Sequence, residues 1–189
     1  SWWKRYTAGT GTKKTEKNPK NRKGGEDMPD ISSLSDTFSV RKLDETDIPW
    51  IYELCRDNPL FYRYHPPFVT KEDLKQDQQA LPPGKTKDDK YYIGFFSEGQ
   101  PVAVMDLVLG YPQANTVFIG FFMMEAKCQG KGIGSRIIGE VCTGLSQWGY
   151  SRVRLATDRE NPQSNAFWEK NGFLFVEEKG PYFLRERIL

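Results

Sequence analysis

The sequence has few of the residues from which metal sites and disulfide frameworks are built. Its 189 residues contain one histidine and three cysteines, and no CxxC pair occurs. A structural zinc site, which takes about four cysteine or histidine ligands, is therefore not expected. Cysteines that are odd in number and widely spaced are typical of a reducing compartment rather than of a disulfide framework. We therefore expect a cytoplasmic protein without a metal site.

Long apolar segments are also missing. No run approaches the ~20 apolar residues that span a membrane, and the start of the chain lacks the apolar stretch of a secretory signal. Hydrophobic residues make up 38% of the chain and aromatic residues 14%, which is a globular composition. The length fits one domain with a proper core. We expect no membrane partner.

Positive charge is concentrated at the start of the chain. Residues 1–35 hold eight Lys or Arg and four Asp or Glu, whereas residues 36–189 hold 19 and 21. The first stretch is rich in Lys, Gly, Thr, Asn and Ser, a composition typical of a tail or linker. We predict a basic low-complexity leader over 1–35, native or added, and a single domain over 36–189. The acidic balance of the domain argues against a nucleic-acid partner for it, although the leader itself leaves one open.

Hydrophobic periodicity predicts the order of the elements. The expected strands are 37–43, a hairpin over 90–110 that turns at 97–101, 116–124, 151–157, 173–178 and 182–189. The expected helices are 44–59, 70–81, 133–148 and 161–171, with 61–70 as a loop. The strand–helix–strand unit from about 117 to 157 requires a parallel pair. The sequence therefore predicts a mixed α/β (α+β) sheet of six to seven mostly antiparallel strands, flanked by about four helices.

The stretch CQGKGIGSRIIG, residues 128–139, places three glycines at alternate positions directly before a predicted helix. Glycine lets the backbone adopt positive φ and approach a ligand closely. A helix N-terminus offers unpaired N–H groups and the positive end of the helix dipole, so the two together favour a phosphate group. Lys131 and Arg136 add positive charge. A glycine-rich turn without a ligand is the structural alternative.

Two nucleotide-binding patterns do not fit this stretch. The pattern GxxxxGK[ST] of NTPases is absent, and with it the lysine and hydroxyl that such sites require. The dinucleotide pattern GxGxxG is not met, because the spacing here is GxGxG. Only one strand–glycine–helix unit occurs, and it follows antiparallel hairpins instead of opening a doubly wound sheet. The phosphate group therefore belongs to another kind of ligand.

Two segments carry a resemblance to a known family. QGKGIGS at 129–135 resembles the Q/R-x-x-G-x-G/A signature of the GNAT superfamily of acetyltransferases. NPQSNAFWEKNGF at 161–173 resembles the segment of the same superfamily that begins with asparagine and ends in Gly-Phe. The match in element order covers residues 38–189. The resemblance implies a GNAT-like fold with a central splayed pair of parallel strands, and an N-acetyltransferase that uses acetyl-CoA as cosubstrate.

The resemblance also implies a coenzyme A site. Residues 129–135 would lie on the pyrophosphate, a backbone N–H of Met123 or Met124 would polarise the thioester carbonyl, and Asn161 would contact the pantetheine arm. The cofactor-binding residues that the resemblance implies are Met123, Met124, Gln129, Gly130, Lys131, Gly132, Ile133, Gly134, Ser135, Asn161, Ser164, Phe167 and Trp168.

The catalytic positions of the family are altered in this chain. Trp168 stands where the family often has a tyrosine that protonates the leaving thiolate, and the strand 116–124 contains no carboxylate. We therefore take Tyr182 as the candidate acid and Asp106 as the candidate base, with plain packing and a hydrogen-bonded acid as the respective alternatives. Tyr64 and His65, in the aromatic loop, are the candidate acceptor-binding residues.

The most concrete interpretation is an enzyme that moves the acetyl group of acetyl-CoA to an amine of a small molecule or peptide. The amine would attack the thioester directly in a ternary complex. A non-catalytic CoA-binding sensor or regulatory domain is the alternative, because the tyrosine is missing. A nucleic-acid-associated protein acting through the leader is a third. The acceptor and the oligomeric state stay open, with a homodimer among the alternatives.

Overall fold

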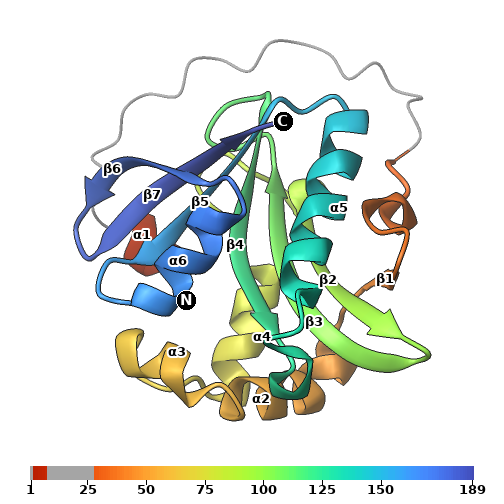
Figure 1. Ribbon diagram of the computed structural model, residues 1–189, viewed down its shortest axis with the longest axis vertical. Helices are drawn as coiled ribbons and strands as arrows, with labels where there is room; N and C mark the ends of the chain where they lie inside the picture. Colours follow the sequence, from red (N-terminus) through yellow and green to blue (C-terminus); the bar gives the residue numbers. More distant parts are fainter. Residues whose placement is uncertain (1, 8–27) are drawn as a thin grey trace.

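A single seven-stranded sheet organises the protein, with strand order β1-β2-β3-β4-β5-β7-β6 (Figure 1). The computed structural model describes residues 2–7 and 28–189, so most of the predicted leader lies outside the described residues. The strands are β1 (Ser39–Lys42), β2 (Lys90–Ser97), β3 (Gln100–Leu109), β4 (Thr116–Met124), β5 (Arg152–Asp158), β6 (Leu174–Lys179) and β7 (Tyr182–Ile188). The α-helices are α1 (Trp2–Thr7), α2 (Ile48–Arg56), α3 (Pro59–Tyr64), α4 (Lys71–Gln79), α5 (Ile133–Gln147) and α6 (Pro162–Lys170). Short 3-10 helices are η1 (Ile31–Leu34), η2 (Glu45–Asp47), η3 (Lys87–Asp89) and η4 (Ala126–Cys128).

The predicted mixed sheet is confirmed. β4 and β5 are parallel, and the other neighbouring strands are antiparallel. The described part of the chain has six α-helices where about four were predicted, because α1 and α3 were not expected. α3 replaces the first part of the loop predicted over 61–70. It begins at Pro59, and proline is tolerated in a first helical turn because that N–H would have no partner there.

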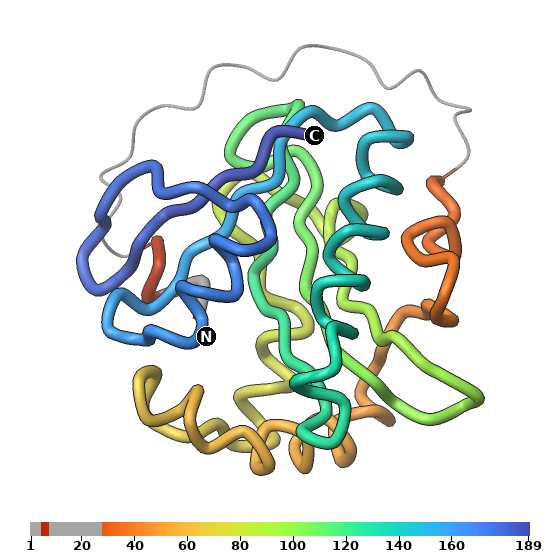
Figure 2. The backbone as a smooth tube through the Cα atoms, viewed as in Figure 1, coloured from red at the N-terminus to blue at the C-terminus, as the bar shows by residue number. Residues whose placement is uncertain are grey.

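Two helical layers enclose the sheet (Figures 1 and 2). α5 and α6 cover one face, where Ile137 and Val141 pack in the largest core cluster. α2, α3 and α4 cover the other face, where Ile51 packs in a second cluster. Successive residues of a strand point to opposite faces, so Met105 of β3 enters the first cluster and Val104 enters the second.

Part of the predicted leader packs on the domain. Leu34 of η1 is fully buried in the core cluster beside α5. The contact is close, since a Cβ on Gly144 would lie 2.9 Å from the Ser33 carbonyl oxygen. In α1, the buried Tyr6 ring lies 5.3 Å from the ring of Phe118 on β4. Packing therefore joins η1 and α1 to the folded domain, although the composition placed both in the leader.

The parallel pairing of β4 with β5 is short, and this opens the sheet. It joins Thr116–Ile119 to Arg152–Leu155, while β4 continues to Met124 and β5 to Asp158. On its other edge β4 stays paired with β3 as far as Met124, with a register shift next to Asp106. Such a shift bends a strand locally. The second half of β4 therefore follows β3 and leaves β5.

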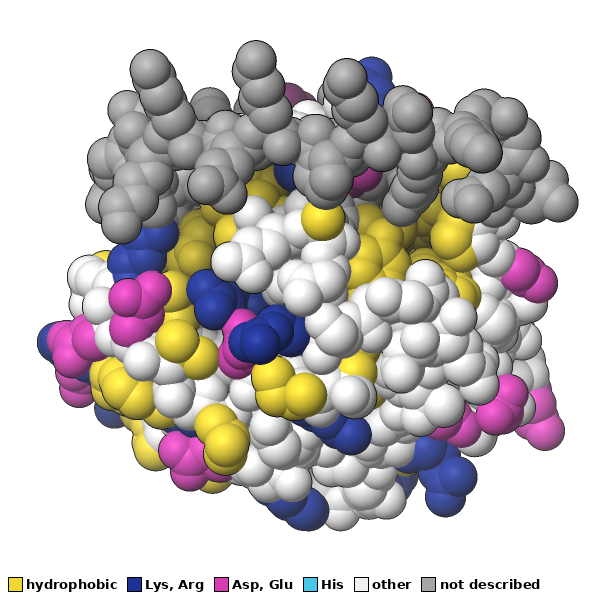
Figure 3. Space-filling view, turned by 90° about the horizontal axis from the view of Figure 1, so that it is seen from above, with side chains coloured by type: hydrophobic (Ala, Val, Ile, Leu, Met, Phe, Trp, Pro, Cys, Tyr) yellow, Lys and Arg dark blue, Asp and Glu magenta, His cyan; other side chains and the backbone are white. Residues whose placement is uncertain are grey.

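On the face of the molecule seen from above, the two signs of charge are not separated (Figure 3). In the view from above, basic and acidic side chains are interspersed among apolar ones (Figure 3). None of the helices within 2–7 and 28–189 has the length and apolar composition needed to cross a membrane.

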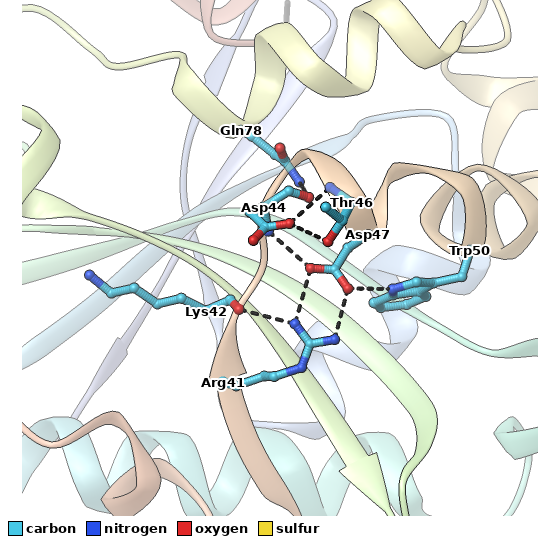
Figure 4. A network of polar contacts seen from close by, with 7 residues as sticks. All are labelled: Arg41, Lys42, Asp44, Thr46, Asp47, Trp50 and Gln78. Carbon is cyan, nitrogen blue, oxygen red and sulfur yellow. Dashed lines mark hydrogen bonds and ion pairs between the residues drawn. The ribbon is translucent and has the colours of Figure 1, made fainter.

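A network around Asp47 fixes the turn between β1 and α2 (Figure 4). The carboxylate of Asp47 accepts two hydrogen bonds from the Arg41 guanidinium, at 2.7 and 3.0 Å, one from Trp50 Nε1 and one from the backbone N–H of Asp44. The hydrogen bonds from Arg41 are the largest influence on its titration. Together with those of Trp50 and Asp44 they lower the pKa of Asp47 to about 2, although its burial acts in the opposite direction.

We expect Asp47→Asn to lower the free energy of unfolding at pH 7 by about 1–3 kcal/mol. The pKa is near 3.8 in the unfolded chain and about 2 in the folded one. The stabilisation is therefore complete above the unfolded value and is lost as the pH falls through the folded value. Urea unfolding at pH 7 and at pH 2.5 measures this, with the exposed Asp36→Asn as control. An equal loss at both pH values would contradict the role of the charge.

Candidate functional site

Two cavities open along the part of β4 that leaves β5. The first, which we call the glycine cavity, measures about 480 Å³. The second, which we call the aspartate cavity, measures about 110 Å³ and is the more enclosed. Gly120 and Phe121 of β4 line the aspartate cavity, and the next three residues, Phe122, Met123 and Met124, line the glycine cavity. Phe61 of α3 lines both, so the two cavities adjoin.

The three glycines at 130, 132 and 134, around the start of α5, serve two different purposes. Gly130 and Gly132 have φ of 71° and 75°, a left-handed conformation that favours glycine, and a Cβ on either would meet open space. Gly134 lies inside α5, where a Cβ would come within 2.7 Å of Met124 Sδ and 3.2 Å of the Phe167 ring. The first two glycines therefore shape the loop, and the third lets α5 pack against β4 and α6.

The N-terminus of α5 borders the glycine cavity. Gly132 is its N-cap and provides no side-chain cap, so the N–H groups of the first turn remain available to a ligand. Gly134 and Ser135 of this turn line the cavity. The positive end of the helix dipole adds a preference for a negatively charged group. The cavity therefore has the features of an anion site at this end.

The glycine cavity brings together almost all of the residues predicted to bind the cofactor. Those that line it are Met123, Met124, Gln129, Gly130, Gly132, Gly134, Ser135, Asn161, Ser164, Phe167 and Trp168. Lys131 and Ile133 do not line it, and the Lys131 ammonium donates to the Lys127 carbonyl instead. The role of these residues toward a cofactor stays a prediction.

The opposite wall of the glycine cavity is formed by residues 57–61 at the junction of α2 and α3, none of which was a predicted site residue. The side-chain amides of Asn58 and Gln129 both donate to the Met124 carbonyl, at 3.0 and 3.2 Å, and Gln129 also donates to Asn58. These bonds tie the end of β4 to both walls of the cavity. The dipeptide Asn58-Pro59 is a turn signal that would have divided the single helix expected over 44–59.

The start of α6 forms the third wall of the glycine cavity. The side-chain oxygen of Asn161 accepts from the Ser164 N–H and caps the helix, and Pro162 follows in the first turn. Trp168 is buried against the cavity, with its ring 5.9 Å from that of Phe122. An indole N–H does not titrate, so Trp168 supplies shape and apolar surface to the cavity rather than a proton.

The aspartate cavity contains Asp106, the predicted base. Asp106 and Lys90 form a buried ion pair with 2.8 Å between Oδ2 and Nζ. The Lys90 ammonium also donates to the carbonyls of Asp77 and Ala80 at 3.0 and 2.8 Å, so its three protons are used. An ion pair of this kind stabilises the ionised carboxylate and makes it a weaker base.

Asp77 of α4 also lines the aspartate cavity, and the sequence did not single it out. The pKa of Asp77 is raised to about 6, chiefly by burial; the nearby charge of Asp106 also acts to raise it and that of Lys90 to lower it. The predicted helix 70–81 is mostly polar, and Leu74, three residues before Asp77 and buried in the structure, is the signal that could have turned this face toward the sheet.

His65 lines the aspartate cavity, as a predicted acceptor-binding residue should, whereas Tyr64 does not. Nδ1 of His65 lies 3.0 and 3.1 Å from the two carboxylate oxygens of Asp158 at the end of β5. Tyr182, the predicted acid, lies next to this pair, with its ring 6.4 Å from that of His65. Burial and the charge of Asp158 raise the pKa of Tyr182. Tyr182 is not among the described residues that line either cavity.

The chain belongs to the Acetyltransferase (GNAT) family, whose sequence profile matches residues 50–173. An acetyltransferase from Thermus thermophilus is similar in structure, with 25% identity and a TM-score of 0.71 over 81% of this chain and 97% of that chain. The PaiA N-acetyltransferase from Thermoplasma acidophilum, solved with coenzyme A, has 20% identity and a TM-score of 0.63 over 80% and 99% of the two chains.

A third similar structure is an acetyltransferase from Salmonella typhimurium that modifies the N-terminal serine of ribosomal protein L7/L12. It has 19% identity and a TM-score of 0.65 over 82% of this chain and 97% of that chain. The two structures below 25% identity establish a common fold. Comparison with curated protein sequences gives no match.

Acetyl-CoA is the cosubstrate of this family, and the glycine cavity fits it. The open left-handed glycines and the uncapped start of α5 suit a pyrophosphate. The edge of β4 that leaves β5 suits an extended arm, because its backbone groups are not used in pairing with β5. The predicted cosubstrate is thus supported both by the family and by the shape of the cavity.

We expect Gly132→Glu to weaken acetyl-CoA binding at least tenfold, because a bulky acidic side chain would enter an anion site. Isothermal titration calorimetry measures the affinity. Gly99→Glu is the matched control, since Gly99 has φ of 77° and open space at its Cβ but lies in the β2–β3 turn. Both variants carry similar backbone strain. If they bind acetyl-CoA with equal affinity, the assignment of the pyrophosphate to this loop is wrong.

We expect Asp77→Asn to stabilise the protein at pH 7.5 by roughly 1–3 kcal/mol and to have little effect at pH 4. The pKa of Asp77 is about 6 in the folded chain, against 3.8 in the unfolded one. Ionisation therefore destabilises the fold increasingly as the pH rises from 3.8 to 6. Thermal unfolding at both pH values tests this, with the exposed Asp88→Asn as control. A gain that is independent of pH would refute the burial of this charge.

Proposed function

We propose that this protein transfers the acetyl group of acetyl-CoA to a primary amine, of a small molecule or of a peptide, by direct attack in a ternary complex. The observation that carries the proposal is the arrangement of the two cavities. They adjoin along consecutive residues of β4, from Gly120 and Phe121 in the aspartate cavity to Phe122, Met123 and Met124 in the glycine cavity. Acetyl-CoA in one cavity would thus present its thioester to an amine in the other.

The two cavities differ in the way that this reaction requires. The glycine cavity would hold the pyrophosphate at Gly130, Gly132 and the start of α5, and a backbone N–H of Met123 or Met124 would orient the thioester carbonyl. The aspartate cavity is lined by the carboxylates of Asp73, Asp77 and Asp106 and by the Arg5 guanidinium. Lys90 is paired with Asp106, so the carboxylates still outnumber the cations and favour a cationic ammonium group. The aromatic and apolar lining of this cavity favours an acceptor that also carries apolar carbon.

Binding in separate cavities supports catalysis through proximity. Holding the amine against the thioester replaces an encounter in solution with a reaction between bound groups, an effect worth several kcal/mol of the barrier. Trp168 and Phe122 would enclose the sulfur end of the cosubstrate and keep water from it. The acetyl group is then passed to nitrogen in preference to water.

Acetyl transfer is tested by incubating the full chain with acetyl-CoA and four amines: phenylethylamine, 1,4-diaminobutane, lysine amide and a peptide with a free N-terminal serine. Thiol release and the mass increase of one acetyl group measure turnover. We expect acetyl-CoA to bind by calorimetry and at least one amine to be acetylated. Gly132→Glu is expected to reduce both binding and turnover.

The outcomes separate the enzyme from its main alternative. Binding of acetyl-CoA without acetylation of any of the four amines would favour a CoA-binding sensor and overturn the proposed transfer. No heat at millimolar acetyl-CoA would overturn the cosubstrate site itself. Replacement of the six Lys and Arg residues within 8–27 by glutamine, together with salt-dependent binding to DNA and RNA, tests the nucleic-acid alternative and leaves α1 in place.

A further inference from the structure

His65 and Asp158 form a buried pair in the wall of the aspartate cavity. His65 ends α3 and is 9% exposed, and the Asp158 side chain at the end of β5 is 13% exposed. Nδ1 of the His65 ring lies 3.0 Å from Oδ1 and 3.1 Å from Oδ2 of Asp158. A carboxylate at one ring nitrogen fixes the tautomer, so Nδ1 carries the proton and Nε2 keeps its lone pair.

The second ring nitrogen is available to a ligand. Within residues 2–7 and 28–189, no hydrogen bond to Nε2 of His65 is found, and the residue lines the cavity. Phe61 packs against the His65 ring at 5.4 Å between centroids and lines both cavities. His65 is thus one helical turn from the point where the cavities adjoin.

The proposed reaction needs a base in the aspartate cavity, where the amine would bind. A primary amine with a pKa near that of lysine, about 10, is protonated at neutral pH and has no lone pair with which to attack. Asp106 is held in its ion pair with Lys90. Tyr182 is kept protonated by its raised pKa. A neutral imidazole, by contrast, accepts protons efficiently near neutral pH.

We propose that His65 is the general base of the acetyl transfer and that Asp158 is its positioning residue, an inference that rests on the proposed function. The carboxylate holds the ring in one orientation and stabilises the imidazolium that forms. The pair joins α3 to β5 across the opening of the sheet, so the base is in place only when both elements are folded. The family motifs at 129–135 and 161–173 contain neither residue.

The proton balance of the step is complete. The amine nitrogen forms a bond to the carbonyl carbon, and the carbon–sulfur bond breaks, with no oxidation or reduction. An entering ammonium loses two protons by way of Nε2. One of them reaches the coenzyme A sulfur through water, and the other is released to the solvent. The charged and titratable groups around His65 are Asp158 on β5, Tyr182 on β7 and Arg5 of α1, together with Tyr62, Asp73, Asp77, Tyr92 and Asp106 in the lining of the cavity.

The test compares His65→Gln, His65→Ala and Asp158→Asn with the wild type, using whichever of the four amines is acetylated fastest. For His65→Gln we expect kcat to fall roughly 10²–10⁴-fold, with KM for acetyl-CoA unchanged and the acidic limb of the pH–rate profile lost. Added imidazole is expected to restore part of the activity of His65→Ala. For Asp158→Asn we expect a smaller fall in kcat with KM for acetyl-CoA unchanged, because the ring loses the carboxylate that orients it.

Arg63→Gln is the matched control, because Arg63 is an exposed residue of the same helix. Thermal unfolding and acetyl-CoA calorimetry on every variant show whether the fold and the cosubstrate site persist. The assignment would be overturned if the wild type acetylates an amine and a folded His65→Gln variant shows the same kcat and the same acidic limb. The proposed function would then still stand. A wild type that binds acetyl-CoA and acetylates no amine would overturn both.

Discussion

The short parallel pairing between β4 and β5 is the constraint on which both cavities depend. Backbone groups of a strand must be paired within a sheet or left available to something else. Here the pairing stops at Ile119 and Leu155, and β4 follows β3 away from β5. The opening therefore exposes the edge of β4. Its last residues line the glycine cavity, and Gly120 and Phe121 line the aspartate cavity. A pairing extended to the end of both strands would close the sheet and remove the space for both ligands.

Polar contacts hold this opening in shape. The Met124 carbonyl at the end of β4 accepts hydrogen bonds from Asn58 and Gln129, which belong to opposite walls of the glycine cavity. At the same point Gly134 lets α5 approach Met124 closely. On the β5 side, Asn165 donates to carbonyls at the end of the strand and at the start of α6. Hydrogen bonds from the connecting segments and from α6 to the ends of β4 and β5 thus define the geometry around the proposed thioester.

Buried and half-buried carboxylates gather on the sheet face that carries α2, α3 and α4. Asp106 is paired with Lys90, Asp158 with His65, and Asp77 has a raised pKa. Burying charge is costly unless it is paired, and such costs cluster at functional sites. The other face, beneath α5, is an ordinary apolar core. The contrast between the two faces is the physical basis for placing the acceptor on the α2–α4 side.

The sequence by itself determined the order of the strands, the parallel pair and the glycine-rich turn before α5. These features depend on local periodicity and on motifs that are contiguous in the chain. The sequence also indicated most residues of the glycine cavity, which lie in two such motifs. Only the tertiary structure decided that Asp77 lines the aspartate cavity, that Asp158 meets His65, and that Asp106 is paired with Lys90. Those relations join residues from separate elements, and their register depends on how β4 diverges and how α3 packs. No local pattern encodes that divergence, so it follows from the packing of the whole sheet.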